Sequence, residues 1–158
     1  MAGFAVVLGS GVALAAGAPK TTIMITPGAS VPLRCVEIAQ GFDGTNAGNT
    51  PVLLELIVTS LATQGVRTIA TPQQTYGEST ATTIASGFVN YTSESTAIVV
   101  IKEWLVTPNG GLLVIQSPLN RELLTTTSLG TIKGFGLRCT AQQAVNVRGY
   151  IEYSEGGG

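Results

Sequence analysis

Residues 98–115 read Ile98-Val99-Val100-Ile101-Lys102-Glu103-Trp104-Leu105-Val106-Thr107-Pro108-Asn109-Gly110-Gly111-Leu112-Leu113-Val114-Ile115. The two apolar runs are rich in β-branched residues, which is typical of strands. Between them, asparagine and glycine tolerate the positive φ that a tight hairpin requires. The sequence therefore predicts strands over Thr96–Thr107 and Leu112–Ser117, with Asn109-Gly110-Gly111 reversing the chain between them as a hairpin.

Similar strand patterns recur along the chain, with turn signals such as Pro27-Gly28 and Asp43-Gly44 between them. Val145 to Tyr153 alternates most clearly, which indicates one face against a core and the other against solvent or a subunit. The further predicted strands are Thr21–Thr26, Val31–Gln40, Val52–Ser60, Leu123–Thr127, Gly134–Thr140 and Val145–Tyr153.

The segment Thr71–Ser95 differs, because it is rich in Thr and Ser and poor in large apolar residues. We predict a long connection with one helical turn near Thr80–Ala85, and long connections of this kind usually carry interactions. Eight or so short strands with irregular connections predict an all-β, two-sheet antiparallel sandwich. A jelly roll is the first expectation, and an immunoglobulin-like sandwich is the second.

The first 19 residues are apolar and interrupted by glycine, and no Lys or Arg precedes Lys20. The positive n-region of a signal peptide is therefore missing, and we expect this segment in the mature protein. We predict an N-terminal arm over residues 1–19 that packs on a neighbour, followed by a single β-sandwich domain over residues 20–158. A first strand of that same domain is the alternative. The predicted interface residues are Phe4, Val6, Val7, Leu8, Val12, Leu14, Tyr76 and Tyr91.

Composition restricts the kind of partner. The chain has 158 residues, of which 44% are hydrophobic and only 11% are charged, against roughly 25% charged in average soluble proteins. The apolar stretch from Phe4 to Ala18 is too short and too interrupted for a spanning helix of ~20 residues, so we expect a surface covered by other protein. Net charge is −1 and no basic run exists, which excludes nucleic acid and an anionic membrane as expected partners.

Catalytic chemistry has little support. The chain contains no histidine, which removes the Ser-His-Asp triad, and two cysteines alone cannot make a four-ligand zinc site. We expect no catalytic residue, cofactor or metal. Cys35 and Cys139, in the echoing tripeptides Leu33-Arg34-Cys35 and Leu137-Arg138-Cys139, are expected to be buried free thiols rather than a disulfide.

The scattered acidic residues have structural uses. The sequence predicts a salt bridge at Arg121-Glu122, and solvent-facing or cross-strand ion pairs for Glu55, Glu103 and Glu152. A glycoside-cleaving enzyme built on paired glutamates is a remote alternative, and it needs a carboxyl separation of ~5–9 Å inside a cleft.

Several segments between residues 31 and 155 share a pattern of turns and strands. They are Val36-Glu37-Ile38, Gly41-Phe42-Asp43-Gly44, Thr50 to Leu56, Glu103 to Gly111, Gln116 to Glu122, Gly136 to Ala141 and Val145 to Tyr150. Together these segments resemble a family of small phage and prophage structural proteins. They carry no catalytic signature, and the apolar N-terminus departs from the short polar start of that family.

The resemblance implies a jelly-roll virion component on the outside of a phage head, assembled in the host cytoplasm. The implied function is that of a capsid decoration or cement protein, which forms homotrimers and binds the major capsid protein. Neutral Thr, Ser, Asn and Gln side chains suit such contacts, because they form hydrogen bonds without the desolvation cost of buried charge. A receptor- or carbohydrate-binding virion module, with Thr71–Ser95, Tyr76 and Tyr91 lining a shallow site, is the alternative.

Overall fold

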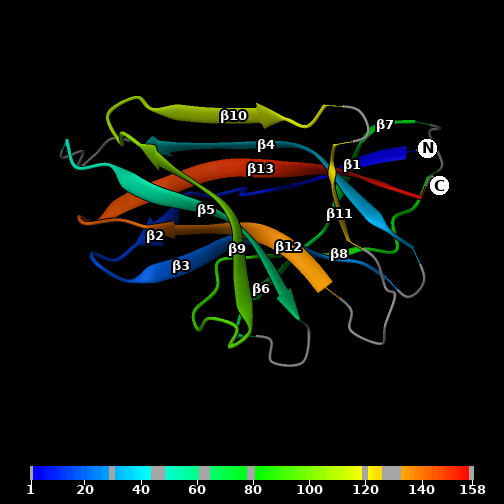
Figure 1. The fold of residues 1–158 in the computed structure, drawn as a ribbon, viewed down its shortest axis with the longest axis horizontal. Coiled ribbons are helices and arrows are strands. Elements are labelled where there is room, and N and C mark those ends of the chain that lie inside the picture. Colours follow the sequence, from blue (N-terminus) through cyan, green and yellow to red (C-terminus); the bar gives the residue numbers. More distant parts are fainter. Residues whose placement is uncertain are drawn as a thin grey trace.

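The computed structural model describes residues 2–28, 31–43, 49–60, 65–77, 81–118, 121–125 and 133–156. Over these residues the protein is built of strands alone, without a helix. The strands form two antiparallel sheets that pack face to face, as Figure 1 shows. The predicted all-β, two-sheet sandwich is confirmed.

The first sheet has β13 near its centre, between β4 and β1. Its order is β10 (Leu112–Gln116), β4 (Leu33–Asp43), β13 (Val145–Glu155), β1 (Ala2–Val7) and β7 (Gln73–Tyr76). Two short strands extend it, since β11 (Leu123–Thr125) pairs with β4 and β2 (Val12–Leu14) pairs with β13.

The second sheet has β12 between β3 and β5. Its order is β6 (Thr68–Ala70), β8 (Ser86–Val89), β3 (Pro19–Thr26), β12 (Lys133–Thr140), β5 (Val52–Ser60) and β9 (Ile98–Val106). Pairing is nested across the two sheets: the last strand, β13, lies between β1 and β4, and β12 lies between β3 and β5. This nesting is compatible with a jelly roll. The jelly-roll topology itself stays a prediction.

Eight strands match the sequence prediction closely. The predicted Val52–Ser60 has the same bounds as β5, and the alternation of Val145 to Tyr153 is the burial pattern of β13. The strand predicted over Leu123–Thr127 begins as predicted in β11, whereas residues 126 and 127 lie outside the described residues.

The predicted hairpin between β9 and β10 is wrong. Asn109-Gly110-Gly111 does reverse the chain: Gly110 has a positive φ of 73°, and the Gly111 amide donates to the Thr107 carbonyl at 3.0 Å. However, β9 pairs with β5 in the second sheet, and β10 pairs with β4 in the first. The turn therefore carries the chain across the sandwich from one sheet to the other.

The connection predicted over Thr71–Ser95 contains two short strands, β7 and β8, one in each sheet. Residues 81–85 form no helical turn, so that prediction is wrong over these residues, while Thr80 lies outside the described part. The carboxylate of Glu155 holds this segment, because it accepts hydrogen bonds from the backbone amides of Ile84 (3.0 Å) and Ala85 (2.8 Å). A residue of β13 thus satisfies two backbone amides of this segment.

The N-terminal segment belongs to the sandwich. β1 pairs with β13 along its full length, from Ala2 opposite Glu155 to Val7 opposite Tyr150. The side chains of Phe4 and Val6 lie in the main core, and the Phe4 ring lies 5.9 Å from that of Tyr153. We therefore correct the prediction of an arm that packs on a neighbour. The alternative applies, in which this segment supplies strands of its own domain.

A buried amide joins the two sheets inside this core. Gln40 of β4 is 1% exposed, and its Nε2 donates to the hydroxyl of Thr22 on β3 at 2.7 Å. That hydroxyl donates to the Leu137 carbonyl at 3.1 Å, and the Cys139 thiol donates to Gln40 Oε1 at 3.2 Å. Gly149 on β13 provides the space for the Gln40 side chain, because a Cβ at this position would lie 2.8 Å from it. The network binds β4 of the first sheet to β3 and β12 of the second.

Valine-to-alanine changes at two neighbouring positions test the placement of β1. Val6 is fully buried and Val7 is 48% exposed, although they are adjacent on one strand. We expect Val6→Ala to lower the free energy of unfolding by about 2 kcal/mol, because it removes two buried methyl groups and leaves a cavity. Val7→Ala should change it by less than about 0.5 kcal/mol. Equal effects in urea unfolding of the two variants would show that β1 does not pack in its own core.

Candidate interaction surface

Exposed apolar side chains gather where the two sheets end on the same side of the sandwich. Among the described residues, β9 is the last strand of the second sheet, and β10 and β11 lie at the edge of the first. We call this surface the apolar rim. It consists of Val99, Val100, Ile101 and Leu105 of β9, Leu112 and Val114 of β10, and Leu124 of β11.

A bulge interrupts β9 in the middle of the rim. The register with β5 shifts between Leu56 and Ile57, so that Leu56 lies opposite Lys102 and Ile57 lies opposite Val100. Ile101 is therefore the extra residue. Leu56 faces the main core, and side chains opposite one another on paired strands share a face. Lys102 consequently emerges on the inner side of the second sheet, toward the space between the sheets.

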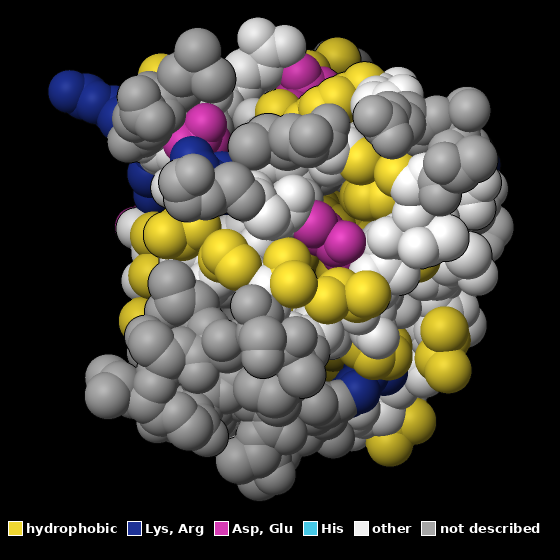
Figure 2. Space-filling model, turned by 90° about the vertical axis from the view of Figure 1, so that its right-hand side faces the viewer, with side chains coloured by type: hydrophobic (Ala, Val, Ile, Leu, Met, Phe, Trp, Pro, Cys, Tyr) yellow, Lys and Arg dark blue, Asp and Glu magenta, His cyan; other side chains and the backbone are white. Residues whose placement is uncertain are grey.

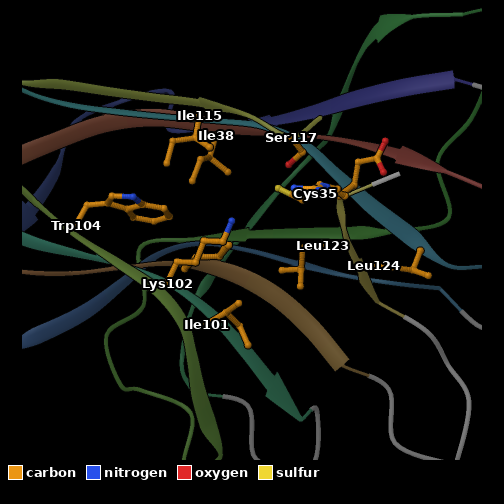
Figure 3. Close-up of a pocket in the computed structure, with 12 residues that line it drawn as sticks. Cys35, Ile38, Ile101, Lys102, Trp104, Ile115, Ser117, Leu123 and Leu124 are labelled. Carbon is orange, nitrogen blue, oxygen red and sulfur yellow. The ribbon is translucent and has the colours of Figure 1, made fainter. Parts of the chain in front are cut away.

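A cavity of about 230 Å³ opens between the sheets behind the rim. Figure 3 shows Lys102 and Trp104 pointing into this space from β9, opposite Ile38 and Ile115 of the first sheet. Cys35, Leu56 and Leu123 complete the apolar part of the wall. Ser117, Arg121 and Glu122 supply polar groups, and Ile101 and Leu124 belong to both the cavity and the rim.

Charged groups are sparse on the surface. Figure 2 shows one face of the molecule, where hydrophobic side chains form a broad band with only a few acidic and basic groups among them. The most buried ion pair joins Arg138 to Glu55 through two hydrogen bonds, of 2.7 and 2.9 Å. Glu55 thus makes the cross-strand ion pair that its position in a strand predicts.

The predicted structural salt bridge at Glu122 is present with a different partner. Its carboxylate lies 3.8 Å from the guanidinium of Arg34 on β4. Arg121 is exposed and lines the mouth of the cavity. The neighbouring Asn120 lies outside the described residues.

The structure disperses the predicted interface residues. Val7 and Tyr76 are exposed, and the Tyr76 ring lies over Gly3, where a side chain would not fit. The other six are buried in this chain, so they offer no exposed interface: Phe4, Val6, Leu8, Val12, Leu14 and Tyr91.

Tyr91 is buried for an identifiable reason. It packs with Met24 and Ile57 in a small second cluster of buried residues, and the guanidinium of Arg67 lies 5.9 Å from its ring. Arg67 also stacks over Phe88, at 3.9 Å from the ring centroid. Tyr91 therefore offers no free face for sugar stacking, and the proposed platform of Tyr76 and Tyr91 is not formed.

Two acidic side chains lie side by side on the outer face of the first sheet. Glu37 and Glu152 are opposite one another on β4 and β13. The hydroxyls of Tyr150 and Thr75 donate to Glu37 and Glu152, respectively. The hydrogen bond to Glu37 raises the pKa of Tyr150 to about 12. Glycoside hydrolysis needs two carboxyl groups that flank a substrate in a cleft, and no observation on these paired acids favours that reaction.

Sequence reasoning missed the residues of the rim. The sequence predicts a strand through Val99, Val100 and Ile101 but no surface function for them. A signal was present, because four consecutive apolar residues from Ile98 to Ile101 break the alternation expected of a half-buried strand. On an edge strand, such a run leaves apolar side chains exposed.

Comparisons with known proteins give no relative. No family model matches the chain, and neither a curated protein nor a solved structure matches it. Within the described ranges, no helix is long and apolar enough to cross a membrane. The same part of the chain contains no group of three or more metal-binding side chains.

Both cysteines are free and buried, as predicted. Cys35 lies on β4 and Cys139 on β12, in different sheets. Burial raises the pKa of each thiol to about 12, so both remain protonated at neutral pH. The thiolate is the reactive form of cysteine, and these positions are therefore unsuited to nucleophilic chemistry.

Thiol labelling tests this environment. At pH 8 a thiol with a pKa of about 12 is ionised in only on the order of one molecule in ten thousand. We expect Ellman's reagent to react with the native protein at least about 100-fold more slowly than with the protein unfolded in guanidinium, which should release two equivalents. Rapid release of one or two equivalents from the native protein at pH 8 would contradict the burial of these side chains.

Proposed function

We propose that this protein is a structural component of a virus particle: a capsid decoration or cement protein that binds the outside of a phage head through the apolar rim. The observation that carries the proposal is the rim itself, where the edges of both sheets present apolar side chains on one side of the sandwich. Apolar side chains that are exposed together at one edge of a protein are typical of an interaction site.

The charge pattern supports protein as the partner. A chain with 11% charged residues leaves wide neutral surface, and the central part of a protein interface is depleted in charge. The major capsid protein is the partner that the resemblance to phage structural proteins implies. We further propose that the protein assembles as a homotrimer and decorates the head, stabilising the shell by protein contacts and without a cofactor.

A charge placed on the rim tests the docking surface. Leu105 is 71% exposed on β9, and Ile69 is 79% exposed on β6, at the opposite edge of the same sheet. We expect Leu105→Glu to weaken binding to expanded, empty heads by at least about tenfold, because a carboxylate would be desolvated in the contact. Ile69→Glu is the matched control and should bind as the unchanged protein does. The heads are those of the phage or prophage whose genome encodes the chain, and co-sedimentation measures binding.

Sedimentation of the free protein separates assembly from docking. Both variants should keep the mass of the unchanged protein, close to three times 16.2 kDa, since neither change alters the fold. If Leu105→Glu coats heads with unchanged affinity, the rim is not the docking surface. If the unchanged protein does not bind heads at all, the decoration function is wrong.

A further inference from the structure

We propose that the cavity behind the rim is a binding site for a small amphipathic carboxylate, an apolar chain that ends in a carboxylate group. Three features carry the inference: apolar walls from both sheets, a lysine that enters the cavity without an acidic partner, and an excess of positive charge at the mouth. The cavity shares Ile101 and Leu124 with the apolar rim, but the inference does not depend on the capsid-binding function proposed above.

The walls of the cavity suit an apolar chain. Ile38 and Ile115 lie opposite one another on β4 and β10, and Leu123 lies opposite Cys35 on β11 and β4. Trp104 and Leu56 close the side of the second sheet. Because these side chains come from both sheets, a chain that enters between them is enclosed by apolar groups, which is typical of ligand sites.

Lys102 provides a charge at a defined place. Its side chain enters the space between the sheets because Lys102 lies opposite Leu56 and alternates with Trp104 on the inner face of β9 (Figure 3). None of the ion pairs among the described residues involves Lys102. Its positive charge acts on the interior of the cavity: burial raises the pKa of Cys35 to about 12, and the charge of Lys102 partly opposes that rise.

The balance of charge at the mouth favours an anion. Lys102 and Arg121 both line the cavity, and the one carboxylate in its wall, that of Glu122, is paired with Arg34. These four groups together carry a net positive charge, although the chain as a whole has a net charge of −1. An ammonium group beside apolar walls discriminates in favour of a ligand with an anionic end and against a cationic one.

The volume limits the size of the ligand. A cavity of about 230 Å³ is smaller than the ~300–1,000 Å³ of most drug-sized ligand pockets. We therefore assign a medium-chain carboxylate, and octanoate is the probe. The apolar chain lies between Ile38, Ile115 and Trp104, and the carboxylate accepts a hydrogen bond from the Lys102 ammonium.

Trp104 makes the site directly observable, because it is the only tryptophan of the chain and lines the cavity. Titration of the full chain with octanoate at low salt should give a saturable change in tryptophan fluorescence. Octanol should bind more weakly, and octylammonium should give no saturable change. Lys102→Met should weaken octanoate binding by about five- to tenfold, as expected for loss of a charge-assisted hydrogen bond at a partly screened site.

Lys20→Met is the matched control, because Lys20 lies outside this cavity and donates to the Ala13 carbonyl. The Lys20→Met variant should bind octanoate with unchanged affinity. Leu105→Glu should also bind octanoate normally, since Leu105 does not line the cavity, so failure of head docking and failure of this site are separable. The inference is overturned by any one of three results: no saturable signal with octanoate, equal binding of octylammonium, or unchanged octanoate affinity in Lys102→Met.

Discussion

The buried amide of Gln40 fixes how the two sheets face one another. An apolar core alone tolerates many alignments of two sheets, because dispersion and burial have little direction. The amide of Gln40, which is 1% exposed, needs partners for both its donor and its acceptor. It does so only when β4 lies over β3 and β12, where Thr22 and Cys139 provide the partners. Any other alignment leaves a polar group buried without a hydrogen bond, at a cost of about 1–3 kcal/mol.

This alignment also determines where the apolar rim lies. With β4 set over β12, the outermost strands on that side, β9 and β10, end near one another on either side of a gap. The chain crosses this gap through Asn109-Gly110-Gly111 rather than folding back within one sheet. The rim and the cavity are therefore products of the same sheet alignment, although they have different chemistry.

The sequence allowed the strands to be predicted, but not their partners. Val145–Tyr153 alternates with a period of two, and Val52–Ser60 is a mostly apolar run that follows Thr50-Pro51; both patterns are local, and each predicts a strand that is present. A turn signal at Asn109-Gly110 shows that the chain reverses, and it is the same for a hairpin and for a crossing between sheets. β1 was misjudged because Gly3 and Ala5 weaken the local strand signal, whereas pairing with β13, more than 140 residues away, supplies its stability.

The candidate surface depended on contacts that local patterns do not show. Tyr91 was predicted at an interface, yet Met24, Ile57 and Arg67 cover it from distant parts of the chain. The burial of both thiols was predictable, since cysteine is a small hydrophobe and no other use was evident. The direction of Lys102 was not, because it follows from the pairing of Lys102 with Leu56, next to a one-residue bulge that appears only when β9 is aligned with β5.

That bulge has a consequence for solubility. An edge strand with a long apolar sequence is a template on which further chains add strand by strand, as in fibrils. The extra residue at Ile101 breaks the regular spacing of the backbone donors and acceptors, and the charge of Lys102 would have to enter any sheet that grew past β9. The strand thus keeps its apolar side chains available to a shaped partner surface while its backbone resists open-ended polymerisation.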